Sequence, residues 1–114
     1  MAKPTVFAGL SLARPLIMGV VNVTPDSFSD GSETMDADAA VARGRALLAA
    51  GADIVDVGGE STRPGALPLA PRDESARVVP VIRALAAAGA VVLVDTRNAR
   101  TMAAALDAHA RIVN

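Results

Sequence analysis

The sequence predicts an α/β protein built around a parallel sheet. Short, nearly continuous apolar runs stand at Leu16–Val21, Ile54–Val57 and Val91–Val94, with a stub at Ile112–Val113. Such runs are typical of parallel strands buried on both faces. Ala-rich stretches of helical length separate them. Alternating strands and helices, joined by right-handed crossovers, give a parallel sheet.

The elements follow one another in a regular order. A short hairpin, Val6 to Leu12 with a turn at Ala8-Gly9, precedes the first strand. The first helix is expected over about residues 37–50. Asp36 can cap its start, and Gly51 is a natural left-handed stop at its end.

Two further helices are expected after the second and third strands. The second, over about 73–88, places Val78, Ile82 and Leu85 on one face and contains Pro80, which predicts a kink or a late helix start. The third, over about 98–108, puts Met102 and Leu106 on one side.

Two architectures fit this order of elements. One is an open doubly wound sheet, and the other is the first half of a (β/α)8 barrel. A complete barrel needs about 250 residues, whereas this chain has 114 and stops in its fourth strand. We therefore expect residues 1–114 to be the N-terminal part of a single barrel domain.

Composition excludes several classes of function. The net charge is -1, and the basic residues form no cluster, which argues against a nucleic-acid partner. The absence of Cys excludes disulfides and thiolate chemistry. No apolar stretch approaches the roughly 20 residues that span a bilayer, and no targeting segment stands out. We expect a cytoplasmic protein without a membrane partner.

Polar residues gather where the predicted strands end. Asn22 follows the first strand, Asp56 lies within the second, Asp95 ends the third, and Asn114 follows the fourth. Ligands of parallel α/β folds bind at the carboxyl ends of strands. Ordinary interpretations remain: Asn22 can serve a turn, and Asp95 can cap a helix. Asp56 needs partners, structural or catalytic, because an unpaired charge inside a strand is costly.

This set of side chains suits a phosphorylated, nitrogen-rich substrate. Thr62 and Arg63, with nearby glycine amides, can clamp an anion. Asn22 with Asp30 offers the hard oxygen ligands that Mg2+ prefers. Asp95 and Asn114 can pair with donors on the edge of a heterocycle. The single histidine, His109, follows the third helix and is interpreted as a helix-end residue rather than a catalytic base.

Three segments resemble dihydropteroate synthase, the folate-pathway enzyme inhibited by sulfonamides. They are MGVVNVTPDSFSDG (18–31), DIVDVGGESTRPGA (53–66) and VDTR (94–97). The resemblance implies a (β/α)8 TIM barrel, of which this chain supplies about the first half, with four parallel strands and three helices. It also implies the condensation of 4-aminobenzoate with 6-hydroxymethyl-7,8-dihydropterin diphosphate to give 7,8-dihydropteroate.

The resemblance also assigns roles to single residues. Asn22 and Asp30 would bind Mg2+ and the leaving diphosphate, and Phe28 would wall the aminobenzoate pocket. Substrate-binding residues implied in the same way are Ser61, Thr62, Arg63, Asp95 and Asn114, and the catalytic set is Asp56, Arg63 and Asp95. In the implied dissociative mechanism, diphosphate leaves first and the aniline nitrogen then attacks a stabilised pterin cation.

The departures from the family pattern leave alternatives open. Ser32 stands where the family usually has a second Gly, and the later pterin-binding residues of the family have no counterpart here. The full-length form is expected to be a homodimer, and the 114-residue piece alone is expected to be inactive. The alternatives are a non-catalytic half-barrel that needs a second chain, or the pterin-binding domain of a methyltransferase.

Overall fold

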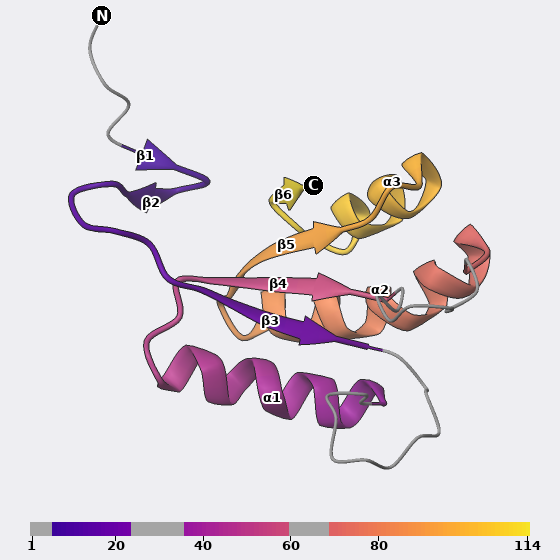
Figure 1. The fold of residues 1–114 in the computed structure, drawn as a ribbon, viewed down its shortest axis with the longest axis horizontal. Helices are drawn as coiled ribbons and strands as arrows, with labels where there is room; N and C mark the ends of the chain where they lie inside the picture. The colour runs from indigo at the N-terminus through magenta and orange to yellow at the C-terminus, as the bar shows by residue number, and fades with distance from the viewer. Residues whose placement is uncertain (1–5, 24–35, 60–68) are drawn as a thin grey trace, which may run out of the picture.

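The computed structural model describes residues 6–23, 36–59 and 69–114. A hairpin of β1 (Val6–Phe7) and β2 (Leu10–Ser11) comes first. The main strands are β3 (Met18–Asn22), β4 (Ile54–Gly58), β5 (Val91–Asp95) and β6 (Ile112–Val113). The helices are α1 (Ala37–Ala49), α2 (Pro71–Ala87) and α3 (Ala99–Asp107) (Figure 1).

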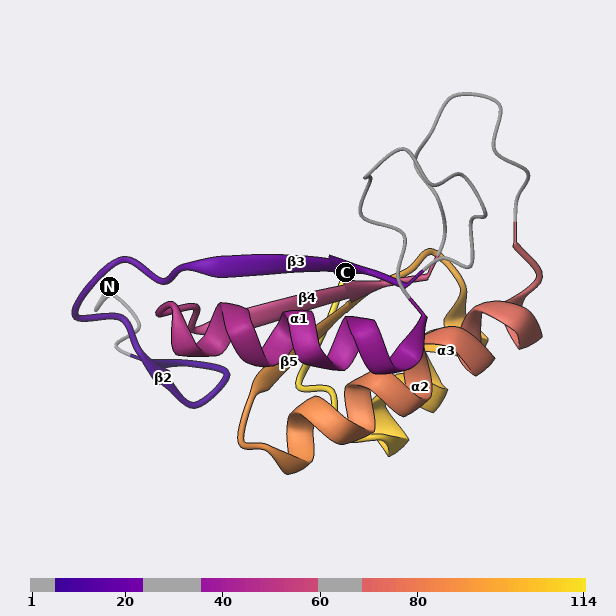
Figure 2. The same ribbon diagram turned by 90° about the horizontal axis from the view of Figure 1, so that it is seen from below.

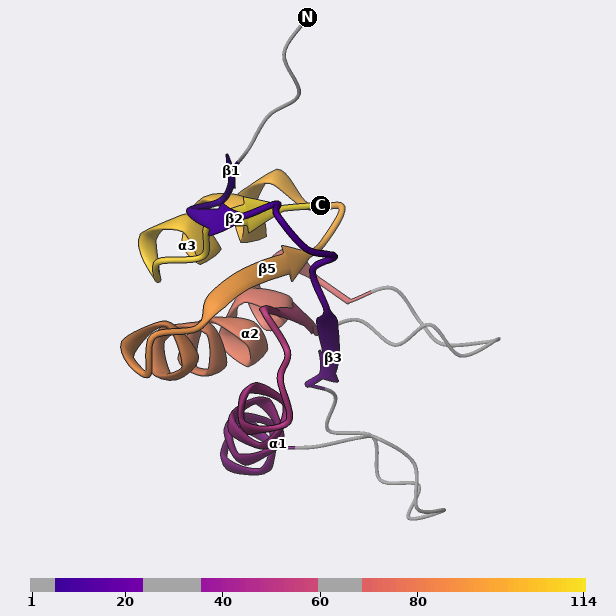
Figure 3. The ribbon, with the colours of Figure 1, turned by 90° about the vertical axis from the view of Figure 1, so that its left-hand side faces the viewer.

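The four main strands form one parallel sheet in the order β3-β4-β5-β6. Each consecutive pair of strands is hydrogen-bonded in parallel, and a helix stands between each pair in the chain. All three helices cover the same face of the sheet (Figures 2 and 3). This arrangement confirms the predicted strand–helix alternation and matches a run of consecutive strands from a (β/α)8 barrel.

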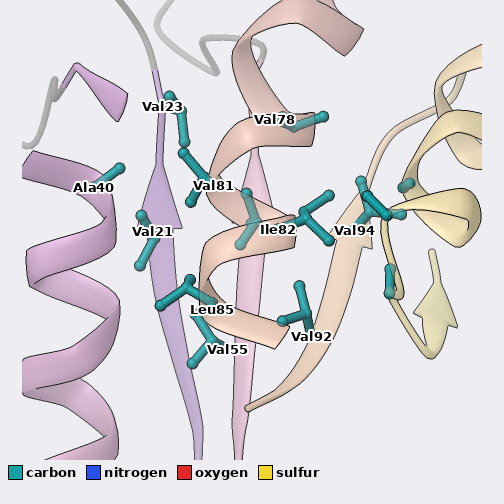
Figure 4. Close-up of a cluster of buried hydrophobic side chains, with 14 of the residues drawn as sticks. Val21, Val23, Ala40, Val55, Val78, Val81, Ile82, Leu85, Val92 and Val94 are labelled. Carbon is teal, nitrogen blue, oxygen red and sulfur yellow. The ribbon is translucent and has the colours of Figure 1, made fainter. Parts of the chain in front are cut away.

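The main core lies between the sheet and the helices. Val21, Val55, Val92 and Val94 point from the strands toward α2, where Ile82 and other apolar side chains meet them (Figure 4). All of these side chains are fully buried. The predicted α2 stripe of Val78, Ile82 and Leu85 is therefore confirmed as a core face.

The opposite face of the sheet, called here the concave face, is covered only in part. Ile54, Val91 and Leu93 are buried there against residues of the hairpin segment, including Ala8 and Leu10. Toward β3 the same face is open, with Met18 50% and Val20 53% exposed. The concave face therefore has a covered end and an uncovered side.

The hairpin turns where the sequence predicted it. Ala8 and Gly9 both have positive φ, 50° and 81°, which is the conformation of a two-residue hairpin turn that matches strand twist. Arg111 donates a hydrogen bond from Nη1 to the Ala8 carbonyl at 3.2 Å. This bond ties the hairpin to the residue before β6.

A second anchor holds the chain between the hairpin and β3. The Asp53 carboxylate accepts hydrogen bonds from Arg14 Nη1 at 3.0 Å and from the Ile17 amide at 2.8 Å. The Arg14 guanidinium and then the Ile17 N–H hold the pKa of Asp53 below its usual value. The anchor fixes the direction in which the chain enters β3.

The first helix and the helix ends agree with the sequence. The Asp36 side chain accepts a hydrogen bond from the Ala39 amide at 2.8 Å, which confirms the predicted cap of α1. Gly51, Gly89 and His109 take positive φ after the three helices, at 110°, 92° and 78°. His109 is thus the helix-end residue that was expected.

The structure excludes one alternative for α2 and shows which face of α3 is buried. Helix α2 begins at Pro71, where proline suits the first turn, and continues through Pro80 rather than starting late. In α3, Leu106 is 50% exposed, and the buried side chains are Thr101 and Ala105. Helix α3 packs on α2, and small side chains allow that close approach better than Met and Leu. Within the described ranges, no helix is long and apolar enough to cross a bilayer.

Candidate functional site

The sheet register brings four of the predicted site residues onto the concave face. Paired residues of neighbouring parallel strands share a face, and the face alternates along each strand. Gly58 is paired with both Asn22 and Asp95, and Asp56 lies two residues before Gly58. Asn114 is two residues beyond Ile112, which is paired with Leu93. Asn22, Asp95 and Asn114 therefore lie at the carboxyl end of one surface, with Asp56 at the middle of β4 on the same face.

Gly58 allows two of these side chains to approach each other. A Cβ added at Gly58 would lie 3.8 Å from Asn22 Oδ1 and 3.9 Å from Asp95 Cβ. Both distances are ordinary van der Waals contacts. Gly58 thus lies between the end of β3 and the end of β5, close to both Asn22 and Asp95.

The two carboxylates on this surface interact. Asp56 is half-buried, and its pKa is raised to about 6, first by burial and then by the negative charge of Asp95. Within the described ranges, no side chain or amide donates a hydrogen bond to the Asp56 carboxylate, and its nearest charge is the repelling carboxylate of Asp95. This pair of acidic groups suits a cationic or N–H-bearing ligand.

Backbone hydrogen bonds fix the end of β5 beside residue 114. The Asn114 amide donates to the Val94 carbonyl at 3.0 Å, and the Thr96 amide donates to the Asn114 carbonyl at 3.0 Å. Asn114 and Asp95 are both exposed at this edge. Asp95 does not cap a helix, because α3 begins after Asn98.

The remaining predicted site residues lie outside the described residues: Phe28, Asp30, Ser61, Thr62 and Arg63. The points where these segments leave the sheet are described. The Val23 amide donates to the Gly58 carbonyl at 2.7 Å, and Arg77 Nη1 donates to the Gly59 carbonyl at 3.0 Å. Both segments thus depart from the same edge that carries Asn22 and Asp95.

The resemblance implies a bound Mg2+, which needs oxygen ligands at this end of the sheet. In the described part of the chain, no group of three or more His, Asp or Glu side chains is placed to hold a metal. Asn22 nevertheless presents its amide oxygen at the end of β3, above Gly58. An amide oxygen is a hard ligand of the kind that Mg2+ accepts, and Mg2+ usually keeps several waters and takes its other ligands from carboxylates and a phosphate.

One residue of this region was missed by the sequence analysis. Glu74, in the first turn of α2, is only 1% exposed and accepts hydrogen bonds from Thr96 and Thr101. Its partners are remote in sequence, so no local motif identifies them. A signal was present all the same: Glu74 lies four residues before Val78, on the buried stripe of the helix, where an acid is expensive unless satisfied.

Comparisons with known proteins identify the family and the fold of the chain. Residues 18–114 match the family described as pterin binding enzyme. The chain is 55% identical over 105 residues to a dihydropteroate synthase from Mycobacterium leprae, covering 92% of this chain and 37% of that protein. It is 49% identical over 98 residues to a dihydropteroate synthase from Neisseria meningitidis serogroup C, covering 85% of this chain and 35% of that protein.

Solved structures give the same result. The dihydropteroate synthase of Xanthomonas albilineans with 4-aminobenzoic acid has a TM-score of 0.82 and 50% identity, covering 94% of this chain and 40% of that one. The Burkholderia cenocepacia dihydropteroate synthase complexed with 7,8-dihydropteroate has a TM-score of 0.77 and 41% identity, covering 92% and 34%. This chain therefore spans well under half the length of the relatives that it matches.

The likeness in fold extends over nearly the whole chain, and the resemblance noted in the sequence is confirmed. The match over residues 18–114 includes all four strands that carry Asn22, Asp56, Asp95 and Asn114. The chain belongs to the pterin-binding enzyme family.

Proposed function

We propose that the protein containing this chain is a dihydropteroate synthase. It would condense 4-aminobenzoate with 6-hydroxymethyl-7,8-dihydropterin diphosphate, releasing diphosphate, in folate biosynthesis. The observation that carries the proposal is the placement of Asn22, Asp56, Asp95 and Asn114 on one surface at one sheet edge. Relatives solved with 4-aminobenzoic acid and with 7,8-dihydropteroate support both the substrate and the product.

The pterin ring is assigned to the acidic part of this surface. A pterin presents N–H donors along one edge, and the Asp95 carboxylate with the Asn114 amide offers matching acceptors. Asp56 lies beside Asp95, close enough that the Asp95 charge helps to raise the Asp56 pKa to about 6. Asp56 would therefore be mostly ionised at neutral pH and present negative charge to the ring.

The diphosphate is assigned to the residues at the ends of β3 and β4. Ser61, Thr62 and Arg63 would bind its oxygens. Asn22 and Asp30 would hold Mg2+, whose chemistry when bound is to offset the negative charge of the diphosphate. Phe28 would wall the aminobenzoate pocket.

The proposed chemistry is electrostatic. The C–O bond to the diphosphate breaks, and its electron pair leaves with the diphosphate, so the pterin methylene becomes cationic. The aniline nitrogen of 4-aminobenzoate then forms the new C–N bond and loses a proton. The carboxylates of Asp56 and Asp95 would stabilise the positive charge that develops on the ring, in a site arranged before the reaction begins.

The wider assignments follow from the same proposal. The full-length protein would act as a homodimer in the cytoplasm. Sulfonamides, which resemble 4-aminobenzoate in shape and charge, would compete for its site.

The test is formation of 7,8-dihydropteroate by the full-length protein. Asp95→Asn should lower kcat/KM by about 10²-fold, the usual cost of removing one group that stabilises transition-state charge. Asp107→Asn is the matched control, because it removes an exposed carboxylate at the end of α3 and should leave the rate unchanged. The 114-residue chain alone should form no product.

Other outcomes would replace the proposal. Binding of a methyl-folate without any condensation would point to a methyltransferase domain. Activity of Asp95→Asn equal to that of the unmodified protein would remove Asp95 from the site. Turnover by a homogeneous preparation of the 114-residue chain would show that the other half is dispensable.

A further inference from the structure

Glu74 is an acid in a place where an acid is costly. It is 1% exposed and lies in the first turn of α2, on the side that faces the sheet and α3. Removing a carboxylate from water costs several kcal/mol unless hydrogen bonds replace the lost hydration. An apolar side chain would fill the same space at lower cost, so the carboxylate invites an explanation beyond packing.

Three donors converge on a single oxygen of Glu74. Thr96 Oγ1 donates to Glu74 Oε1 at 2.8 Å, Asn98 Nδ2 at 2.8 Å, and Thr101 Oγ1 at 2.6 Å. Two of these donors, Thr96 and Asn98, belong to the short segment that follows Asp95 at the end of β5. The carboxylate therefore fixes the path of the chain immediately after a proposed pterin ligand.

The Asn98 side chain gives up a helix-capping hydrogen bond in order to contact Glu74. Asn98 is the N-cap residue of α3, but its side chain makes no capping hydrogen bond; it donates to Glu74 instead. The Asn98 amide in turn donates to Thr96 Oγ1 at 3.1 Å. Asparagine is among the best N-cap residues, so the hydrogen bond to Glu74 replaces one that would stabilise α3 itself.

The same part of α2 also holds the end of β4. Arg77 Nη1 donates to the Gly59 carbonyl at 3.0 Å. A Cβ at Gly59 would lie 3.5 Å from Glu74 Cγ and 2.9 Å from Val78 Cγ1. Residues 74–78 of α2 thus contact the residues that follow two neighbouring strands. One of these strands is β4, which leads to Thr62 and Arg63, and the other is β5, which ends in Asp95.

We propose that Glu74 is a positioning residue: its carboxylate holds Thr96 and Asn98 so that Asp95 faces the pterin ring. The inference rests on the proposed function, because the pterin is the ligand that Asp95 is assigned to bind. Glu74 itself, buried behind the sheet edge, touches no substrate.

The test compares Glu74→Gln with Asp73→Asn in the full-length protein. Both remove one negative charge from the first turn of α2, but Asp73 is exposed. The Gln amide keeps the shape of Glu74 and weakens its three hydrogen bonds, since charge-assisted bonds are the stronger ones. Well below the unfolding temperature of each variant, Glu74→Gln should raise KM for the pterin diphosphate by about tenfold, because small misplacements of site groups have large effects. KM for 4-aminobenzoate should stay unchanged.

A double variant separates a positioning role of Glu74 from a general effect on stability. Thr96→Val removes one of the donors to Glu74, so the effects of Glu74→Gln and Thr96→Val on the pterin KM should be less than additive in the double variant. The inference is overturned if Glu74→Gln lowers the unfolding temperature while both KM values match those of Asp73→Asn.

Failure of the proposed function would give a different result. The unmodified protein would then neither bind the pterin diphosphate nor form product. Amide hydrogen exchange still tests the positioning role in that case. The Thr96 and Asn98 amides should exchange faster in Glu74→Gln than in Asp73→Asn, and equal exchange would show that Glu74 does not hold this segment.

Discussion

Asp56 and Asp95 place two negative charges at one edge of the concave face. The Asp56 carboxylate is half-buried, and its pKa is raised to about 6 by burial and by Asp95. Near neutral pH the Asp56 carboxylate is mostly ionised, at some cost to the folded protein because of its burial and the nearby Asp95. A ligand that carries positive charge or N–H donors would relieve that cost.

The raised pKa of Asp56 makes stability depend on pH in a definite direction. The folded protein keeps the proton up to about pH 6, whereas the unfolded chain loses it near 3.8. Between these values the folded state binds more protons, so its stability falls as pH rises. Asp56→Asn has no such ionisation. Its free energy of unfolding, relative to that of the unmodified protein, should therefore be roughly 1 kcal/mol higher at pH 7 than at pH 4, after allowance for solvent screening.

Urea unfolding at the two pH values checks this expectation. Asp38→Asn, which removes an exposed carboxylate from the first turn of α1, serves as the control and should show no comparable difference. A stability difference between Asp56→Asn and the unmodified protein that is the same at both pH values would contradict the assigned pKa.

At the scale of elements, α1 and α2 pack closely because α1 has a glycine at their contact. Gly44 is buried, and a Cβ added there would lie 2.7 Å from both Cδ atoms of Leu85. Leu85 is fully buried in the main core. The glycine lowers the helix propensity of α1 by about 1 kcal/mol relative to alanine, but it lets α1 approach α2.

Gly44→Ala should destabilise the protein by about 1 kcal/mol, because overpacking costs more than the helix propensity returns. The change is measured by thermal or urea unfolding. In the double variant Gly44→Ala/Leu85→Val the smaller side chain makes room, so Leu85→Val should cost less there than it does alone. A stabilised Gly44→Ala would mean that Leu85 can move aside at little cost.

At the scale of the whole molecule, most of the architecture was predictable and part of the site was not. Apolar runs and glycine stops predict the sheet and the helix ends because they act locally. The buried face of α3 did not follow from the shared side of Met102 and Leu106, because contact with α2 buries Thr101 and Ala105 instead. Glu74 was missed for the same reason, since its partners come from other elements.

The open side of the concave face has consequences for the behaviour of the isolated chain. Met18 and Val20 expose about half of their surface on edge strand β3. An apolar patch beside an unpaired strand edge favours association with another chain. Pairing of a further strand with β3 would cover this surface.

We predict that the isolated chain self-associates and that Val20→Thr weakens this association. Val20 is 53% exposed, so the polar side chain costs little in the monomer. Sedimentation velocity measures the change. Val21→Thr is the matched control, because Val21 is fully buried on the opposite face of the same strand; it should lower stability by about 1–3 kcal/mol, the cost of burying a hydroxyl without a partner. Equal association of Val20→Thr and the unmodified chain would place the contact elsewhere.

The position of the hairpin also indicates how the protein is best attached to a solid surface. The hairpin covers the ends of β4 and β5 where those strands begin (Figure 1), whereas Asn22, Asp95 and Asn114 lie where β3, β5 and β6 finish. A sensor chip or resin coupled through the hairpin turn would hold the molecule with the candidate site toward the solution. Coupling near residue 114 would press that end against the support.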